Sequence, residues 1–381
     1  MGKGVINMIF EPAIGGHLLE YIHNIYIYAT KSEHRFIFVL SSKFNDVKDN
    51  LVWPSSDNIE IITLSNEESN KCRNTNLIKS SWYFNKCLCH YVKKYHVDNV
   101  MLLYLIRSMP LLPFFIPLNT HVSGIIYNIP LYHNNIPFTK KIINKITYYL
   151  LAKCKNIKNI FLLNDQWSVD VYNNRYQTKK FVHLTDPIPN IDMSAVRDLR
   201  AELSIAKENK IYLQFGSLDE RKNTLNILRA LLLMSQEELK NKTFIFSGKL
   251  SKEIKEEFYR LVNSLKNKVQ IIVKEGFVTY EFLNSLCYTS DCILTIYNNV
   301  EMSSGTIGYA SFFEKPVIGP SKGLLGKLIH ENNLGCVIDS NSPADIKTAL
   351  IRQIEPIESV YKETHTVDNF CKTIFSSITY N

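Results

Sequence analysis

The sequence predicts an α/β protein built from two doubly wound parallel sheets, each covered by helices on both faces. Short apolar runs alternate with segments of helical periodicity along nearly the whole chain, as in successive β-α-β units. A length of 381 residues suits two domains of ordinary size. Residues 186–190 contain two prolines near the middle of the chain and are the best linker candidate. Together these observations indicate two Rossmann-like domains.

In the first half, apolar runs of strand length end at turn residues or lead into helical patterns. The strands that we expect there are 5–10, 35–40, 59–64, 99–105, 122–127 and 159–163, the last of this half. Helical periodicity begins at 17–18 and returns at 76–95. Residues 140–150 are basic and aromatic and predict an amphipathic helix, which either packs on the sheet or lies on a membrane.

The second half repeats the alternation. We expect strands at 211–215, 243–247, 270–273 and 292–297, and a further strand starting at 317. Helices are predicted at 194–203, 224–233, 251–266, 343–353 and 367–378, and one more follows Ser303 and stops at Pro316.

Charge is divided unevenly between the halves. Residues 1–190 hold 21 Lys and Arg against 13 Asp and Glu, whereas residues 191–381 hold 23 of each. The net charge of +8 therefore lies in the first half. A basic half favours an anionic membrane or a phosphorylated substrate, and no nucleic-acid-binding motif accompanies it. A merely solvated basic face is the alternative.

Other sequence features exclude several protein classes. The eight cysteines form no CxxC pair and no zinc-binding spacing, which predicts reduced thiols in a cytosol. The first ten residues do not form a signal peptide. The longest apolar run, 100–118, is interrupted by an arginine and three prolines, which argues against a membrane span.

The stretch from Glu301 to Gly319 carries the strongest local signal. It follows an apolar run, and Ser303, Ser304 and Gly305 favour a helix start. A helix that begins after a buried strand presents free backbone N–H groups and its positive dipole end, which together bind anions. The same residues also suit an ordinary turn of a doubly wound sheet, so geometry alone leaves both interpretations open.

This stretch resembles the donor-binding motif of retaining GT-B glycosyltransferases of family 4. In that motif a second Glu lies eight residues after the first. A Gly-x-Pro-Val sequence, the stop, then ends the helix. Glu301 stands at the first Glu and Lys315-Pro316-Val317 matches the stop, whereas Tyr309 replaces the second Glu. The resemblance implies the GT-B fold, two Rossmann-like domains facing a cleft. It also implies a catalytic Glu301 that contacts the sugar, and donor-binding roles for Ser303, Ser304, Gly305, Thr306 and Tyr309.

Two more loops of the second half carry the resemblance, which spans roughly residues 211–319. Lys222 lies six residues after Gly216, at the position of the family's diphosphate-binding Lys. Ser217 replaces a family Arg, and Arg221 can supply the missing charge. Positive charge is needed because negative charge grows on the leaving diphosphate. The loop at Phe277 and Val278 corresponds to the segment that holds the nucleotide base.

The first half resembles the family only in its strand pattern and in Gly15 and Gly16, which implies that this loop faces the donor phosphates. Histidines beside strand ends are candidates for catalysis: His17, His121 and His133. We expect His17 and His133 to act with Glu301. No carboxylate pair and no metal-ligand pattern has motif support, so we expect neither a metal nor a cofactor, the nucleotide-sugar being a substrate.

We expect an acceptor-binding domain at 1–187, a nucleotide-sugar-binding domain at 188–360, and a C-terminal helix at 361–381 that crosses back to the first domain. The expected reaction moves a sugar, with retention, from a nucleotide-sugar to a saccharide or lipid-linked acceptor of capsule or lipopolysaccharide biosynthesis. We expect a cytoplasmic protein that can work at the inner face of the cell membrane, in contact with its anionic lipids. Two alternatives stay open, a sugar-nucleotide epimerase and a non-catalytic GT-B subunit. The loss of the second Glu favours the latter.

Overall fold

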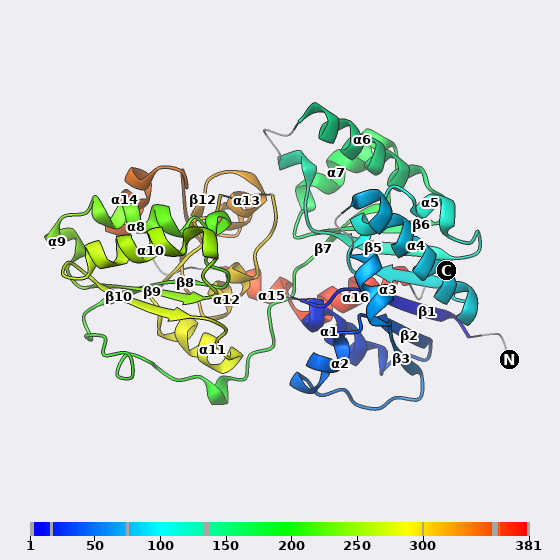
Figure 1. The fold of residues 1–381 in the computed structure, drawn as a ribbon, viewed down its shortest axis with the longest axis horizontal. Coiled ribbons are helices and arrows are strands. Elements are labelled where there is room, and N and C mark those ends of the chain that lie inside the picture. The colour runs from blue at the N-terminus through cyan, green and yellow to red at the C-terminus, as the bar shows by residue number, and fades with distance from the viewer. Residues whose placement is uncertain are drawn as a thin grey trace. The chain divides into compact units, whose positions relative to one another are not determined.

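The computed structural model describes residues 4–15, 18–73, 76–132, 137–298, 301–352, 357 and 359–378. The chain divides into two compact units (Figure 1). Unit 1 comprises residues 1–185 and 367–381, and unit 2 comprises residues 186–366. The sequence placed the corresponding boundaries at 187/188 and 360/361.

Unit 1 contains a parallel sheet of seven strands in the order β3-β2-β1-β4-β5-β6-β7. The strands are β1 (Ile6–Glu11), β2 (Arg35–Leu40), β3 (Ile59–Thr63), β4 (Asn99–Leu102), β5 (His121–Ile126), β6 (Ile157–Leu163) and β7 (Phe181–Leu184). The six expected strands are present. The expectation that the strand at 159–163 would be the last was wrong, because the short run at 181–184 pairs with β6 as β7.

The helices of unit 1 follow its strands and cover the sheet (Figure 1). They are α1 (Leu18–Ala29), α2 (Phe44–Val47), α3 (Asn66–Cys72), α4 (Leu77–Tyr95), α5 (Leu112–Phe115), α6 (Phe138–Lys153) and α7 (Gln166–Tyr176). Short 3₁₀ turns are η1 (Lys48–Asn50), η2 (Leu105–Ser108) and η3 (Pro130–Tyr132). Helix α4 begins where the Asn76 side chain accepts a hydrogen bond from the Lys79 N–H. It ends at His96, which has a left-handed φ of 52°.

The last helix, α16 (Val367–Ile378), packs in the core of unit 1. Its apolar face, with Phe370, Ile374 and Ile378, is buried beside residues of α1 and β2. The Asn99 side chain donates a hydrogen bond to the Ile378 carbonyl at 2.8 Å. The C-terminal segment therefore completes the hydrophobic core of unit 1.

Unit 2 contains a parallel sheet of six strands in the order β10-β9-β8-β11-β12-β13. The strands are β8 (Lys210–Phe215), β9 (Lys242–Gly248), β10 (Gln270–Glu275), β11 (Cys292–Leu294), β12 (Val317–Pro320) and β13 (Gly335–Ile338). Both described sheets are thus doubly wound, as the sequence predicts. The strand predicted at 292–297 ends at Leu294, so Thr295, Ile296 and Tyr297 belong to the loop that follows.

The helical segments of unit 2 pack on both faces of this sheet (Figure 1). They are η4 (Met193–Ala195), η5 (Glu220–Lys222), α8 (Thr224–Leu232), α9 (Gln236–Leu239), α10 (Lys252–Leu265), α11 (Tyr280–Thr289), α12 (Gly305–Phe312), α13 (Gly323–Glu331), α14 (Pro343–Ile351) and α15 (Tyr361–Thr364). Helices α8, α10 and α14 share one apolar cluster with β8 and β9.

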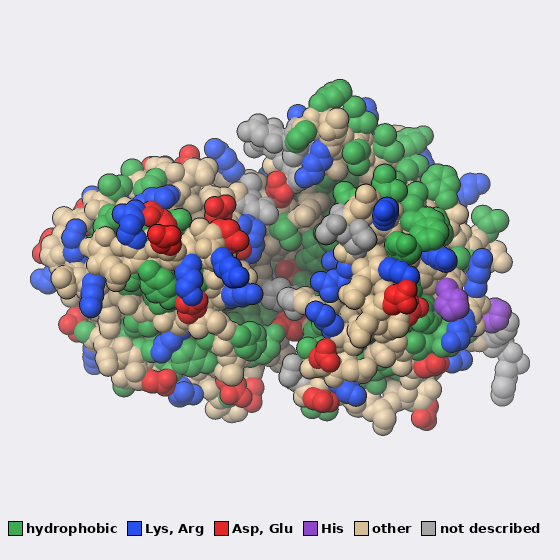
Figure 2. Space-filling view, viewed as in Figure 1, with side chains coloured by type: hydrophobic (Ala, Val, Ile, Leu, Met, Phe, Trp, Pro, Cys, Tyr) green, Lys and Arg blue, Asp and Glu red, His purple; other side chains and the backbone are tan. Residues whose placement is uncertain are grey.

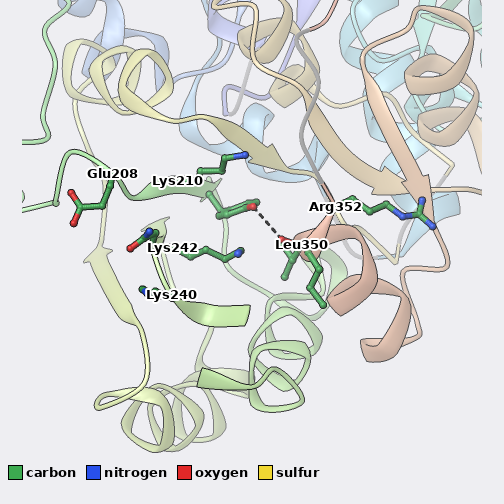
Figure 3. Close-up of a pocket in the computed structure, with 9 residues that line it drawn as sticks. Glu208, Lys210, Lys240, Lys242, Leu350 and Arg352 are labelled. Carbon is green, nitrogen blue, oxygen red and sulfur yellow. Dashed lines mark hydrogen bonds between the residues drawn. The ribbon is translucent and has the colours of Figure 1, made fainter. Parts of the chain in front are cut away.

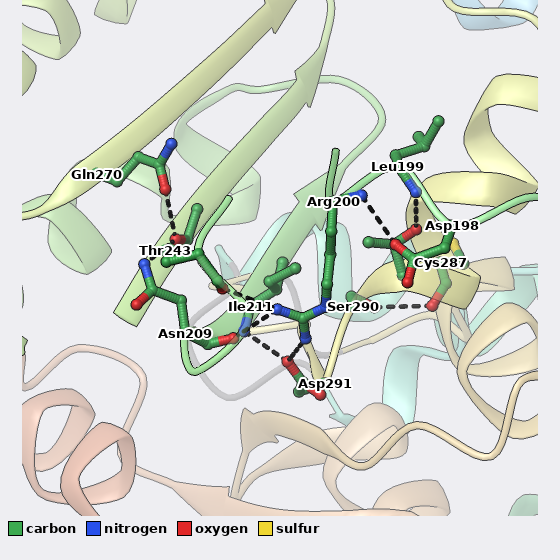
Figure 4. A network of polar contacts seen from close by, with 12 residues as sticks. Asp198, Leu199, Arg200, Asn209, Ile211, Thr243, Gln270, Cys287, Ser290 and Asp291 are labelled. Atoms are coloured by element: carbon green, nitrogen blue, oxygen red, sulfur yellow. Dashed lines mark hydrogen bonds and ion pairs between the residues drawn. The ribbon is translucent and has the colours of Figure 1, made fainter. Parts of the chain in front are cut away.

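The helix predicted at 194–203 is wrong, since only the short turn η4 forms there. The backbone N–H of Leu199 donates to the Thr289 hydroxyl at 2.9 Å instead of to a helical carbonyl. The Arg200 guanidinium donates to the Asn209 carbonyl at 2.8 Å and to the Asp291 carboxylate at 3.0 Å (Figure 4). Contacts with the sheet and α11 therefore override the local helical periodicity.

Candidate functional site

Three loops of unit 2 leave the same edge of its sheet. They follow β8, β10 and β11, and all strands of this sheet run parallel, so their carboxyl ends lie along one side. Ligands of open α/β sheets bind outside the carboxyl ends of the strands. Every donor-binding residue expected in the second half lies in these loops or in α12.

The loop after β8 packs against the loop after β9 through two glycines. Gly248 has a φ of +139°, and a Cβ atom there would lie 1.8 Å from the Gly216 carbonyl oxygen. Gly216 has a φ of +95°, and a Cβ atom there would lie 2.6 Å from the Lys222 Nζ atom. Only glycine allows both the backbone conformation and the close approach. Gly216 thus leaves the space that the Lys222 ammonium occupies at the end of β8, and Gly248 lets the two loops pack closely.

Lys222 is the central cation of this edge. Its side chain is buried, with 7% of the residue exposed, and its Nζ donates to the Phe215 carbonyl at 2.5 Å. The ammonium also lies 5.1 Å from the centre of the Tyr297 ring. Within the described parts of the chain, no carboxylate forms an ion pair with it. A buried ammonium without a carboxylate partner is suited to hold an anion.

Arg221, the second expected cation, is held more loosely. Its side chain is 45% exposed and lies 3.6 Å from the Asp219 carboxylate. Asp219 also accepts a hydrogen bond from the Lys222 backbone N–H at 3.0 Å, which fixes the turn η5. Arg221 can therefore approach a ligand only by giving up an exposed ion pair, which costs little.

The start of α12 is built as the sequence predicts. Ser304 is the residue before the helix, and its hydroxyl accepts a hydrogen bond from the Thr306 N–H at 3.3 Å. Ser303 donates to the Asp186 carboxylate at 3.4 Å. Gly305 opens the helix without a side chain, and the next two N–H groups are held by Ser304, since the Thr306 N–H donates to its hydroxyl and the Ile307 N–H to its carbonyl at 3.1 Å.

Tyr297 joins the cation to the helix start, and sequence reasoning missed this residue. Its hydroxyl shares a hydrogen bond of 2.8 Å with the Thr306 hydroxyl and accepts one of 3.4 Å from Ser304. Burial raises the pKa of the phenol, but the Lys222 ammonium and the hydrogen bonds from Ser304, Thr306 and Lys222 outweigh it, so the pKa lies below its usual value. The only sequence signal was an aromatic residue after an apolar run.

Tyr309, which replaces the family's second Glu, packs inside unit 2. Only 3% of the residue is exposed, and its ring meets the Phe215 ring edge-on at 5.5 Å between centroids. The expected contact with the ribose stays a prediction. The observed contact with the Phe215 ring supports the last residue of β8. This residue therefore acts on the site through Phe215, whose carbonyl holds Lys222.

Replacing Tyr309 with Glu is expected to destabilise unit 2, because a carboxylate would be buried beside an aromatic ring. The Tyr309→Phe variant keeps the ring and serves as the matched control. Thermal melting should show a loss of several degrees for the Glu variant and a much smaller change for Phe. An unchanged melting temperature for Tyr309→Glu, with stronger nucleotide binding, would instead place this residue at the ribose.

The loop after β10 presents an aromatic ring to solvent. Phe277 is 89% exposed, and its ring meets the Tyr280 ring edge-on at 6.5 Å. Val278, its neighbour, is half-buried. An exposed ring beside the end of a strand offers a flat apolar surface on which a nucleotide base can stack. The role in base binding that the resemblance implies for this loop stays a prediction.

Glu301 follows β11 and precedes α12 on the same edge. The residue is half-buried, and the two residues before it, Asn299 and Val300, lie outside the described residues. Its role in sugar binding stays a prediction. Its position four residues ahead of Gly305 places the carboxylate next to the helix start rather than on the helix.

In unit 1, several expected site residues cannot be placed. Gly16, His17 and His133 lie outside the described residues. Gly15 is exposed, and a Cβ atom there would meet no atom within 4 Å. The candidate His121 is wrong, because it is the first residue of β5 and lies at the amino end of the sheet, away from the edge where ligands bind.

The cavity at the other edge of unit 2 is basic but contains none of the expected site residues. It has a volume of about 380 Å³ and lies at the amino ends of β8 and β9 (Figure 3). Lys210 and Lys242 are direct neighbours across these strands, and Arg352 follows α14. Burial and the nearby Lys210 lower the pKa of Lys242. The cavity is open and lined mainly by exposed side chains.

Two classes of feature are not found in the described residues. No helix there is both long and apolar enough to cross a bilayer. No group of three or more His, Cys, Asp or Glu side chains in the same residues is arranged to hold a metal ion. All eight cysteines are free thiols.

Comparison with known proteins finds similarity in structure only. No protein-family model and no curated sequence matches the chain. Among solved structures, Anabaena HepE in complex with UDP is 13% identical, with a TM-score of 0.68 over 99% of this chain and 100% of HepE. Sucrose-phosphate synthase from Thermosynechococcus elongatus is 13% identical, with a TM-score of 0.65 over 99% of this chain and 95% of the synthase.

A third similar structure is WaaG, described as a glycosyltransferase involved in lipopolysaccharide biosynthesis. It is 14% identical, with a TM-score of 0.61 over 97% of this chain and 94% of WaaG. At such identities the similarity concerns the fold, and it extends over the whole length of all three proteins. The chain therefore has the GT-B fold, the fold of glycosyltransferases such as WaaG.

Proposed function

We propose that the protein is a glycosyltransferase that takes a sugar from a nucleotide-sugar bound at the carboxyl edge of unit 2. The arrangement around Lys222 carries this proposal, because a buried ammonium, a tyrosine hydroxyl and the start of α12 converge there. Such a combination of fixed positive charge and the positive dipole end of a helix suits a diphosphate.

The structural neighbours support the choice of donor. HepE has been solved with UDP and with UDP-glucose, and it shares the fold of this chain over its whole length. We propose that the base stacks on Phe277, that Lys222 holds the diphosphate, and that the sugar lies beside Glu301. Lys222 then stabilises the negative charge that grows on the diphosphate as the glycosidic bond breaks. We propose that this charge replaces a metal ion, and that transfer proceeds with retention.

Donor turnover tests the proposed activity. The purified protein, incubated with UDP-, GDP-, ADP- and CDP-sugars, should release the nucleoside diphosphate from at least one of them, even without an acceptor, by slow hydrolysis. A reversible change in the sugar with no release would favour an epimerase. Binding without any turnover would favour a non-catalytic GT-B subunit.

Replacing Glu301 with Gln is expected to lower turnover at least tenfold and to leave the melting temperature unchanged. The amide keeps the shape of the side chain, but it cannot form the charged hydrogen bond to a sugar hydroxyl, worth about 1.5–3 kcal/mol. Single-turnover rates at saturating donor measure the loss. Glu331, at the end of α13, is the control, and its Gln variant should be as active as the wild type. Equal rates for both variants would remove Glu301 from the reaction.

We further propose that the acceptor is a saccharide or a lipid-linked saccharide of a surface polysaccharide, and that α6 brings the protein to the membrane. Residues 138–146 of α6 are exposed apart from the half-buried Asn144, and the helix carries exposed apolar and basic side chains together. Its exposed apolar residues are Phe138, Ile142, Ile143, Ile146 and Tyr149, and its exposed lysines are Lys140, Lys141 and Lys145. Figure 2 shows the hydrophobic side chains gathered over α5 and α6.

Vesicle sedimentation tests this membrane contact. The protein should sediment with vesicles that contain anionic lipid at low ionic strength, and salt should release it, because screening weakens surface attraction. The Ile143→Ser, Ile146→Ser double variant should lose most of this binding, since less apolar area can enter the bilayer. Ile351→Ser, an exposed position of unit 2, is the control. Failure of the wild type to sediment would favour a soluble acceptor.

A further inference from the structure

A second polar surface lies at the carboxyl ends of the central strands of unit 1. Glu11 ends β1, and Tyr104 and Arg107 follow β4, its neighbour in the sheet. Tyr127 follows β5, which pairs with β4. These four residues, from three adjacent parallel strands, form the Arg107 surface. None of them was expected from the sequence to have a function.

Aromatic rings hold the Arg107 side chain at this surface. Its guanidinium carbon lies 4.7 Å from the centre of the Tyr104 ring, and the Tyr104 ring lies 5.4 Å from the Tyr127 ring. The Arg107 side chain is 29% exposed, and both tyrosines are half-buried. A stacked guanidinium loses little freedom when it binds a ligand, and its planar fork matches two oxygen atoms at once.

Glu11 contacts Arg107 and is buried, with 1% of the residue exposed. One of its carboxyl oxygens lies 3.5 Å from the Arg107 guanidinium and accepts the Ala13 N–H at 3.0 Å. Burial raises the pKa of Glu11 to about 7, against the attraction of Arg107, the hydrogen bond from the Ala13 N–H and the weaker attraction of Arg73. Near neutral pH, Glu11 therefore neutralises Arg107 only in part, and the surface keeps positive charge.

We propose that Arg107, stacked on Tyr104 beside Tyr127, binds an anionic oxygen group of the acceptor, a phosphate or a carboxylate carried by a saccharide. This inference rests on the proposed function, because it names the substrate class of the second substrate of that reaction. The tyrosine rings contact the apolar face of the sugar, and the guanidinium donates two parallel hydrogen bonds to oxygen atoms of the anion. Glu11 is a positioning residue, because its contact with the guanidinium fixes the orientation of the Arg107 side chain.

A protonation effect follows from this geometry. An anion at Arg107 is repelled by ionised Glu11 and is not repelled by neutral Glu11, so bound anion favours protonation. Affinity should therefore rise as the pH falls through 7. The charged groups that act on the Glu11 carboxyl are Arg107 from η2 and Arg73, which follows α3.

Calorimetric titration of the full-length protein with glucuronate, glucose 1-phosphate and glucose tests the proposal. Glucuronate serves as the probe for pH dependence because its own carboxylate stays ionised between pH 6 and 8. The wild type should bind at least one of the two anionic probes at least tenfold more tightly than glucose, and the stronger of the two identifies the carboxylate or the phosphate as the preferred group. Arg107→Gln should lose this difference, and Arg107→Lys should keep only part of it.

Three further variants separate the possible causes of a change. Glu11→Gln should bind glucuronate between pH 6 and 8 about as tightly as the wild type does at pH 6, without the pH dependence, because Gln is neutral like protonated Glu11. The Glu11→Gln, Arg107→Gln double variant removes both charges, so it avoids a buried unpaired carboxylate and keeps the test valid if Arg107→Gln alone does not fold. Lys222→Met should bind glucuronate like the wild type. The inference is overturned if the double variant binds each of the two anionic probes with the same affinity as the wild type. A different result would contradict the proposed function, namely that the wild type binds no nucleoside diphosphate.

Discussion

Replacing Lys222 with Met should weaken the binding of the nucleoside diphosphate product about 100-fold, close to 3 kcal/mol. Met fills nearly the same space, so the variant removes the charge and little of the packing. The ammonium is buried at the end of β8, beside Tyr297, where low polarity strengthens its attraction for phosphate. Isothermal titration with UDP, GDP, ADP and CDP measures the loss.

Two comparisons define what this result means. Arg221→Gln should weaken binding by less than Lys222→Met, because Arg221 is 45% exposed and already paired with Asp219. Lys210→Met, at the amino end of the same sheet, should have no effect. If Lys210→Met weakens binding more than Lys222→Met, the nucleotide is bound at the wrong edge of the sheet for the proposed function.

Gly248→Ala is expected to destabilise unit 2 by about 3 kcal/mol, which lowers its melting temperature by roughly 6–12 °C. The new methyl group would lie 1.8 Å from the Gly216 carbonyl oxygen, and the φ of +139° is rarely adopted by alanine. The two loops at the ends of β8 and β9 would have to separate, which moves Lys222. Nucleotide affinity should therefore fall together with stability.

Two other glycines separate steric overlap from backbone strain. Gly276 has a φ of +109° but no atom within 4 Å of a Cβ position, so Gly276→Ala should show the conformational cost alone, about 1–2 kcal/mol. Gly15→Ala has open space and should be nearly neutral. Differential scanning calorimetry of the three variants gives the order. A Gly248→Ala variant as stable as Gly15→Ala would show that the close approach of these loops is not needed.

The sequence predicted those parts of the site whose signals are local. Pro316, the small residues after Ser303 and the apolar run before Tyr297 mark the α12 loop within about 25 residues, and the spacing from Gly216 to Lys222 is shorter still. Such signals depend on turn and capping preferences that neighbouring residues decide. The parallel strand order of the unit 2 sheet then brings these loops to one edge.

The missed features depend on residues that are distant in the chain. Glu11 and Arg107 are 96 positions apart and meet only because β1 and β4 pair in the sheet. Tyr297 meets Lys222 through the pairing of β8 with β11. The helix predicted at 194–203 failed for the same reason, because that segment donates hydrogen bonds to α11 and to Asp291, which its local sequence pattern does not reveal. The sequence left burial at position 309 open, since a tyrosine suits both a core and a binding surface.

A crystal structure of the protein grown with UDP tests the central claim most directly. We expect the diphosphate at the carboxyl edge of the unit 2 sheet, with a phosphate oxygen within hydrogen-bonding distance of the Lys222 Nζ atom and close to Gly305 at the start of α12. The base should stack on the Phe277 ring. UDP bound between Lys210 and Lys242 at the opposite edge, or bound in unit 1 alone, would contradict the account.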